Sequence, residues 1–223
     1  MKRFRLEVIL GTVLAALFLL FCWWQNPGAK LSRADVDAYL KQIDARAVLP
    51  APEKAELIAH LRGWGEADDG KPVYMLNLMR FYAELRPWPG ADVRAASPAE
   101  SNALYERVVI PMVLRSGTFP VVGSDVQGVL GGATPSTNLI GNEPAIENWS
   151  RVLVMRYPSR RAFFDLISDP EYLKVMPYKL AALKLALIPT DGALVVPDLR
   201  FVLGAIFLMA FLLFGWIRAA SRR

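Results

Sequence analysis

The chain has 223 residues, 54% of them hydrophobic, and a formal net charge of +5 at pH 7. Residues 25–197 hold 19 basic and 19 acidic side chains, so the positive excess lies entirely in the two ends of the chain. The middle of the chain therefore lacks the basic stripe with which nucleic-acid-binding domains hold phosphates, and no nucleic-acid partner is expected. The single cysteine excludes an intramolecular disulfide.

Residues 8–24 form an uncharged apolar run, VILGTVLAALFLLFCWW, that follows Lys2, Arg3 and Arg5. A helix that spans a bilayer needs roughly 17–25 apolar residues, so we expect a membrane anchor over 1–25. A cleaved signal peptide is the alternative, but the sequence WWQNPGAK at the end of the run lacks a small-residue cleavage site.

A second uncharged run, FVLGAIFLMAFLLFGWI, covers residues 201–217, and Arg218 follows it. We expect a second anchor over 198–223. A buried core helix is the alternative, but a Trp216 ring close to a basic residue is typical of a membrane interface. Because basic residues near the ends of spans favour the cytoplasmic side, both termini are expected in the cytoplasm. The composition, rich in Leu, Ala and Arg, indicates a bacterial source, hence a two-pass inner-membrane protein with a periplasmic domain.

Residues 26–70 are predicted to form a helical neck next to the membrane. Ser32 and Asp35 have the spacing of a capping box and precede apolar residues at helical spacing. After a Pro-Ala-Pro turn, residues 53–62 predict a second short helix.

Residues 71–197 are predicted to form one α+β domain. Apolar runs rich in strand-forming residues predict strands at 73–81, 119–130, 149–157 and a last strand built from 186–188 and 193–196. Capping residues and helical spacing predict helices that start after Ser97 and after Ser159, with a break at Asp169-Pro170 and a restart over 171–185. The order strand, helix, strand, strand, helix, strand predicts a ferredoxin-like split βαβ fold, with helices on one face of an antiparallel sheet.

Four pieces of sequence carry a family resemblance: VYMLNLMRF, YERVVIP, the glycine-bearing second strand, and WSRVLVMRYPSRRAFFDLISDPEYLKVMPYKLAAL. The most specific piece is Tyr157-Pro158-Ser159 followed by SDPEY at 168–172. Over residues 72–190 the chain resembles a short uncharacterised family of the dimeric α/β barrel superfamily. The resemblance implies a ferredoxin-like protomer that pairs sheet to sheet with a second copy.

The wider superfamily includes cofactor-independent monooxygenases, lactone isomerases and haem enzymes, but the resemblance to the short family implies no particular reaction. Its members are usually soluble, so the neck and both predicted spans depart from its pattern. Haem enzymes of the superfamily use a histidine on the barrel's own helix, whereas the single histidine, His60, falls on the predicted neck. With no Cys/His cluster, P-loop or nucleophile elbow in the sequence, no metal or cofactor is expected.

Six polar side chains are candidates for lining a pocket: Asn77, Arg80, Tyr105, Arg156, Tyr172 and Lys179. Asn77 falls on an apolar strand face, so its amide either braces neighbouring backbone or faces a cavity. Arg80 falls on the opposite face of the same strand. Arg151 and Arg156 fall on opposite faces of the third strand, so at most one of them faces a pocket. Glu106 is expected in solvent.

This set lacks the histidine or paired carboxylates typical of general acid–base catalysis. We therefore expect, first, a non-enzymatic accessory or assembly subunit that presents its domain to a larger membrane complex. Trp64, Trp88 and Trp149 would be its interface anchors, because tryptophan is favoured at interfaces. Its partners would be membrane lipid and either other membrane-protein subunits or a second copy. The alternative is a cofactor-independent monooxygenase or isomerase that acts on a small apolar substrate, oriented by Asn77 and Tyr105.

Overall fold

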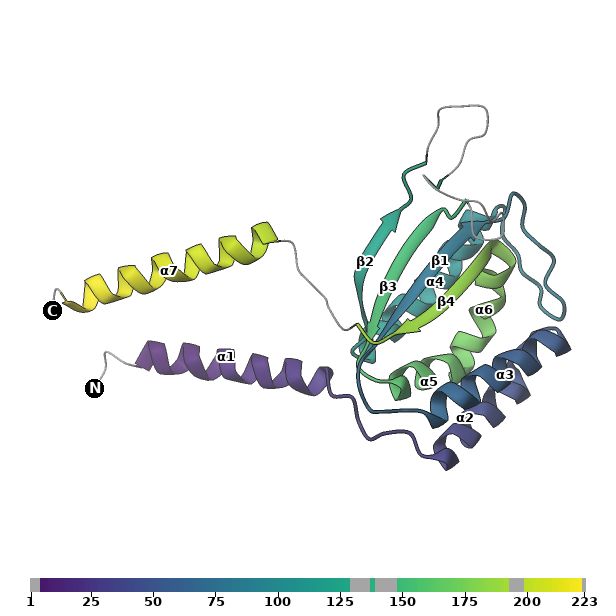
Figure 1. Cartoon of the computed structure of the whole chain (residues 1–223), viewed down its shortest axis with the longest axis horizontal. Coiled ribbons are helices and arrows are strands. Elements are labelled where there is room, and N and C mark those ends of the chain that lie inside the picture. Colours follow the sequence, from purple (N-terminus) through teal and green to yellow (C-terminus); the bar gives the residue numbers. More distant parts are fainter. Residues whose placement is uncertain (1–4, 129–136, 139–147, 193–198, 222–223) are drawn as a thin grey trace. The chain divides into compact units, whose positions relative to one another are not determined.

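The computed structural model describes residues 5–128, 137–138, 148–192 and 199–221. The chain divides into a unit from Met1 to Asp191 and a unit from Gly192 to Arg223. The described part of the first unit is α+β, as predicted, with six helices and one four-stranded antiparallel sheet (Figure 1). The second unit contains helix α7 (Leu199–Ser221).

The strands lie in the spatial order β2-β3-β1-β4, and each neighbouring pair is antiparallel. Their bounds are β1 (Val73–Phe81), β2 (Phe119–Asp125), β3 (Arg151–Tyr157) and β4 (Leu183–Thr190). The chain order of strands and helices is the predicted one, although β2 ends earlier than expected. β4 begins where the prediction still had helix, and the expected strand piece at 193–196 lies outside the described residues.

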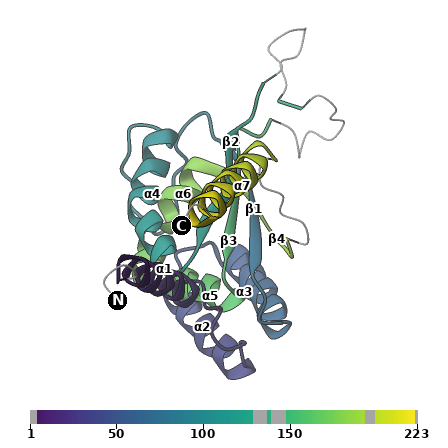
Figure 2. The ribbon, with the colours of Figure 1, turned by 90° about the vertical axis from the view of Figure 1, so that its left-hand side faces the viewer.

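Three helices, α4 (Pro98–Arg115), α5 (Arg160–Ser168) and α6 (Pro170–Ala182), follow the strands in the predicted places. They lie on one side of the sheet (Figure 2). Ser97 and Ser159 cap α4 and α5 by accepting hydrogen bonds from backbone N–H groups in the first turn, and Asp169 caps α6 in the same way. These side chains satisfy donors that have no partner inside the helix, which fixes where each helix begins.

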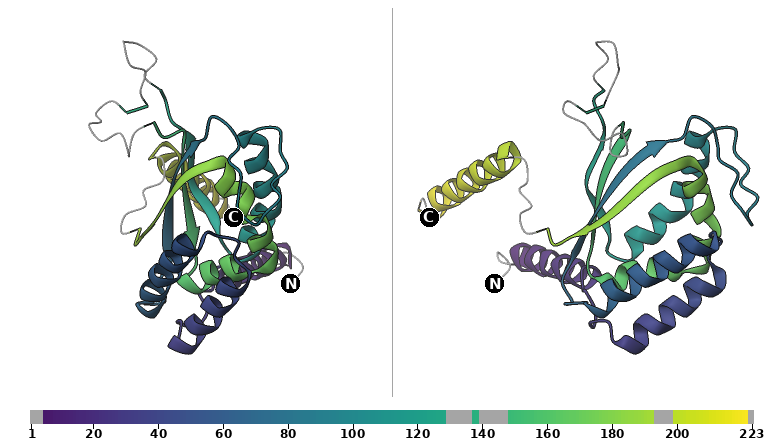
Figure 3. Two further views of the ribbon diagram at one scale, coloured as in Figure 1. Left: turned by 90° about the vertical axis from the view of Figure 1, so that its right-hand side faces the viewer. Right: turned by 45° about the vertical axis from the view of Figure 1, so that its right-hand side comes forward.

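Helices α2 (Arg33–Arg46) and α3 (Ala51–Glu66) correspond to the predicted neck, and Ser32 forms the predicted capping box with Asp35. They lie beside each other and α2 packs on α5 (Figure 3). Val36 of α2 and Phe164 of α5 are both fully buried in one continuous core. Gly65 of α3 makes room for this packing, because a Cβ there would lie 2.9 Å from the Phe164 ring. The neck segment therefore shares the core of the sheet domain.

One helix in the described part of the chain, Val202–Ser221, is long and apolar enough to cross a membrane. The apolar part of α1 (Arg5–Trp24) is Ile9–Trp24, which is shorter than a full span. The expected pair of flanking spans is thus supported at the C-terminal end only. The apolar side chains of α1 are nevertheless exposed, from 49% for Val13 to 72% for Trp23.

The end of α1 is attached to the turn between α4 and β2. Trp24 Nε1 donates a 2.8 Å hydrogen bond to the Leu114 carbonyl oxygen, and the Trp24 ring stacks on Phe119 with centroids 6.1 Å apart. Gln25 Nε2 donates a 2.8 Å hydrogen bond to the Gly117 carbonyl oxygen. Gly117 has a φ of +76°, and a Cβ there would lie 2.3 Å from the Trp24 carbonyl oxygen. The attachment therefore requires glycine at this position.

Candidate functional site

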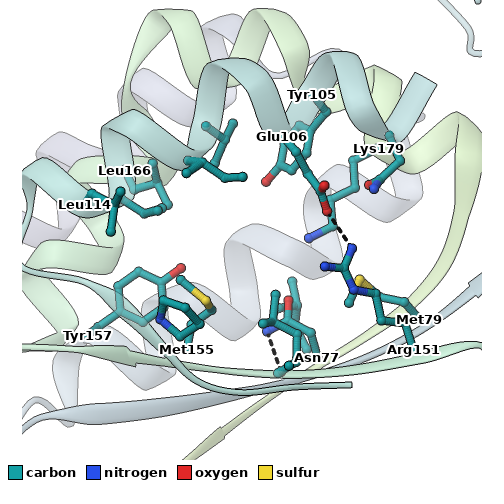
Figure 4. A pocket seen from close by; sticks show the side chains of 18 of the residues that line it. Asn77, Met79, Tyr105, Glu106, Leu114, Arg151, Met155, Tyr157, Leu166 and Lys179 are labelled. Atoms are coloured by element: carbon teal, nitrogen blue, oxygen red, sulfur yellow. Dashed lines mark hydrogen bonds and ion pairs between the residues drawn. The ribbon is translucent and has the colours of Figure 1, made fainter. Parts of the chain in front are cut away.

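A cavity of about 500 Å³ lies between α4 and the sheet (Figure 4). α4 packs mainly against α6, and the cavity occupies the space between α4 and strands β2 and β3. Side chains from the strands and from α4, α5 and α6 line it, and most of them are apolar. Its volume lies in the range of roughly 300–1,000 Å³ that is typical of small-molecule sites.

Four side chains form what we call the polar end of the cavity: Tyr105, Glu106, Arg151 and Lys179 (Figure 4). Asp125 of β2, which pairs in register with Arg151, also lines the cavity next to this end. Arg151 donates a 2.8 Å hydrogen bond to the Glu106 carboxylate. Lys179 Nζ lies 5.2 Å from the centroid of the Tyr105 ring, a cation–π distance. Among the described residues no carboxylate forms an ion pair with Lys179, so its ammonium is free to meet an anionic group in the cavity.

Burial is the largest influence on Lys179 and lowers the pKa of its ammonium to about 8. The nearby Glu106 carboxylate opposes this shift, and the Arg151 guanidinium adds to it. A desolvated cation of this kind is stabilised strongly by an anion that enters its surroundings. The polar end is therefore suited to an anionic oxygen.

Three tyrosines line the same cavity: Tyr105 and Tyr157, which are buried, and Tyr172, which is half-buried. The rings of Tyr105 and Tyr172 meet edge to face, with centroids 6.0 Å apart. Burial raises the pKa of all three phenols above the usual value of 10. They are therefore neutral at physiological pH, and their hydroxyl groups can donate hydrogen bonds to a ligand oxygen.

Asn77 is 4% exposed and lines the cavity near its centre. Its Nδ2 donates hydrogen bonds of 2.9 Å to the Met75 carbonyl oxygen and 3.3 Å to the Leu153 carbonyl oxygen. Both roles that the sequence left open therefore apply. The amide braces β1 against β3, and the side chain forms part of the cavity wall.

The structure brings four of the six candidate residues together in the cavity: Asn77, Tyr105, Tyr172 and Lys179. Arg80 and Arg156 lie on the other face of the sheet, where they pair in register with Lys184 and Tyr74. Arg156 is hydrogen-bonded to Gln25 there and its guanidinium lies over the Phe119 ring. Neither arginine lines the cavity.

Arg151 and Glu106 belong to the cavity but were not among the candidates. Arg151 pairs with Met79, a helix-facing residue of β1, so its side chain points toward α4. There it meets Glu106, which the sequence analysis placed in solvent. The alternation of side chains along β3 predicted that only one of Arg151 and Arg156 faces the pocket. The register of β3 with β1 shows that it is Arg151.

The other residues singled out from the sequence lie elsewhere. Trp64 packs against Phe163 and Phe164, with ring centroids 5.4 and 5.9 Å away, and Trp88 Nε1 donates a 2.6 Å hydrogen bond to the Val48 carbonyl oxygen. Both are thus engaged within the domain, whereas Trp149 is half-buried just before β3 and His60 is exposed on α3. In the part of the chain that the structure describes, no group of three or more His, Cys, Asp or Glu residues is placed to hold a metal.

The lowered pKa of Lys179 predicts that the domain becomes more stable between about pH 8 and pH 10. In this window the folded protein has released the Lys179 proton while the unfolded chain still binds it, and stability rises with pH when the unfolded state binds more protons. Above about pH 10 the trend reverses, because unfolded tyrosines ionise there while Tyr105 and Tyr157 resist ionisation. Thermal melts across this pH range check the prediction. The increase in thermal stability should be absent in Lys179→Met. An increase of the same size in Lys179→Met would contradict the prediction.

No family model matches the chain, and no curated protein matches it. Among solved structures, a protein of unknown function from Rhodopseudomonas palustris, RPA0582, is 29% identical over 68% of this chain and 98% of its own, with a TM-score of 0.49. The methylated form of RPA0582 is 28% identical over 68% of this chain and 96% of its own, with a TM-score of 0.48.

Proposed function

We propose that the first unit is a ferredoxin-like domain of the dimeric α/β barrel type that binds a small, largely apolar molecule in the cavity beneath α4. The strand order β2-β3-β1-β4 and the helices on one face support this fold. The observation that carries the function is Lys179, a desolvated ammonium with no ion-pair partner among the described residues, in a mostly apolar cavity. Such a group is complementary to an anionic or enolic oxygen on an apolar molecule.

The proposed activity is cofactor-independent and of the isomerase or monooxygenase type. Removal of a proton next to a carbonyl group leaves negative charge on the oxygen, and preorganised donors in a water-poor site stabilise that charge. Lys179 and the neutral Tyr105 hydroxyl are the donors in this proposal, and Glu106 is the carboxylate that accepts the proton. In an isomerisation the protonated Glu106 returns the proton to a different carbon of the substrate. In a monooxygenation dioxygen is the co-substrate and oxidant: one oxygen atom enters the product and the other leaves as water. Lys179 supplies the positive charge in this proposal, because Arg80 and Arg156 do not line the cavity and Arg151 is paired with Glu106.

A side chain introduced at Gly123 is expected to abolish ligand retention. Gly123 lines the cavity from β2, and the nearest heavy atom to a Cβ there would be Leu153 Cδ1 at 3.6 Å, an ordinary contact. Gly123→Phe should therefore fill the cavity without displacing the backbone. In native mass spectrometry of detergent-purified protein, we expect a bound small molecule in the natural protein and none in Gly123→Phe.

Val122→Phe is the matched control for this experiment. Val122 neighbours Gly123 on β2 but pairs with Val154 on the other face of the sheet. This variant is expected to retain the ligand as the natural protein does. Loss in both variants, or retention in both, would contradict the proposed site.

We propose a second copy of this chain as the partner, seated on the sheet face opposite the helices. Leu76 and Leu78 pair there with Val154 and Val152, and Ile188 of β4 on the same face is 42% exposed. A contiguous apolar face of this kind marks an interaction surface, and two copies joined sheet to sheet would cover it. The same face favours the second candidate function, an accessory subunit whose sheet is covered by another membrane protein.

We further propose that both apolar helices cross the bacterial inner membrane and that both termini lie in the cytoplasm. Support for α1 comes from its apolar side chains, which are exposed along the helix as in a lipid-facing segment. Support for the orientation comes from the basic residues outside both apolar runs. The sheet domain would then lie in the periplasm, close to the membrane surface.

A further inference from the structure

The cavity is amphiphilic along its length. Opposite the polar end lies what we call the apolar end, formed by Leu114, Met155 and Leu166, with the ring of Tyr157 beside them (Figure 4). Along α4, Glu106 at the polar end and Leu114 at the apolar end are about 12 Å apart at 1.5 Å rise per residue. A molecule that satisfies both ends has an anionic head and an apolar body.

The apolar end is also the open end. Leu114 of this end lines the cavity and is 43% exposed, and Ile110, one turn before it on α4, lines the cavity and is 50% exposed. Opposite them, Pro120 and Gly123 of the edge strand β2 line the cavity and are exposed. The mouth of the cavity therefore lies between α4 and β2. Its part beside Leu114 and Pro120 is apolar, whereas Ser124 and Asp125, which are also exposed on β2, line the part near Arg151.

This mouth adjoins the point where α1 meets the domain. The Leu114 carbonyl accepts the hydrogen bond from Trp24, the last residue of α1, and Trp24 stacks on Phe119 at the start of β2. The same two segments, the end of α4 and the start of β2, therefore hold the membrane-proximal helix and frame the mouth. In a membrane-held protein, an opening in this position faces the lipid surface.

We propose that the ligand is a membrane-partitioned amphiphile with an anionic oxygen head, which enters from the lipid surface through the mouth beside Leu114 and places its head at Lys179. The inference deepens the proposed function and rests on it. A second cavity of about 240 Å³ offers the tail another position, because it shares Lys179 and Tyr172 with the first cavity and extends toward Leu57 and Met176. We place the tail at the mouth beside Leu114 and not in the second cavity, because only the mouth lies next to the end of α1.

The test uses the full chain in phosphatidylcholine vesicles and a palmitic acid analogue with a diazirine midway along its chain, a position that reaches the mouth when the carboxylate lies at Lys179. After irradiation and digestion, the label is expected on α4 near Ile110 and Leu114 or on β2 near Pro120. The corresponding fatty alcohol lacks the anionic head and should label roughly tenfold less. Ile110→Asp places a charge in the apolar mouth and should reduce labelling by roughly tenfold, whereas Ala103→Asp, elsewhere on the exposed surface of α4, should not.

Three results would overturn the inference while leaving the proposed function standing. They are a label near Leu57 or Met176, equal labelling by the alcohol and the acid, and displacement of the probe by hexanoate as efficient as displacement by palmitate. Absence of any label in the cavity, together with no small molecule in native mass spectra of the purified protein, would overturn the proposed function as well.

Discussion

Lys179→Met is expected to weaken binding of the palmitic acid analogue by roughly 10- to 100-fold, because a hydrogen bond to a charged group contributes roughly 1.5–3 kcal/mol. The thermal midpoint should stay the same or rise. Burial of the Lys179 ammonium destabilises the folded protein. A methionine of similar length fills the same space without burying a charge. Titration of the probe and a thermal melt on the same preparation measure both quantities.

Lys174→Met is the matched control, because Lys174 lies on the same helix and is exposed. It is expected to bind the probe as the natural protein does. A Lys179→Met protein with undiminished affinity would contradict a role for the ammonium in the site. Lower affinity accompanied by a much lower melting temperature would show a structural role instead.

Gly117→Ala is expected to destabilise the domain by more than the roughly 1–2 kcal/mol that a left-handed backbone costs an L-residue. The added Cβ would lie 2.3 Å from the Trp24 carbonyl oxygen, and neither backbone segment can relieve the overlap without moving. The Trp24 hydrogen bond to Leu114 and its stacking on Phe119 would then be lost. A lower thermal midpoint and faster proteolysis after α1 should follow.

Gly63→Ala provides the comparison for this variant. Gly63 lies in α3, and a Cβ there would meet nothing within 4 Å. Alanine should stabilise this helix by roughly 0.5–1 kcal/mol. If Gly117→Ala were as stable as Gly63→Ala, the described attachment of α1 to the domain would be wrong.

The order of elements was predictable because its signals are local. Ser32, Ser97 and Ser159 each cap the helix that the sequence placed after them. The alternation of β1 also predicted that Asn77 and Arg80 point to opposite faces, as the register confirms. Such features depend on residues a few positions apart, so the sequence alone contains them.

The features that were missed depend on contacts between distant segments. Arg151 reaches Glu106 only because β3 pairs with β1 in one register and α4 crosses above both. Likewise, Val36 and Phe164 come from segments far apart in sequence, and their contact makes the predicted neck part of the sheet domain's core. No local pattern specifies either arrangement.

The most direct test of the account is native mass spectrometry of the full chain, extracted gently from its own membranes. We predict a homodimer that retains a small molecule with an apolar body and an acidic group. Extraction at fixed stoichiometry with larger membrane proteins, with the cavity empty, would contradict the account and establish the accessory-subunit alternative.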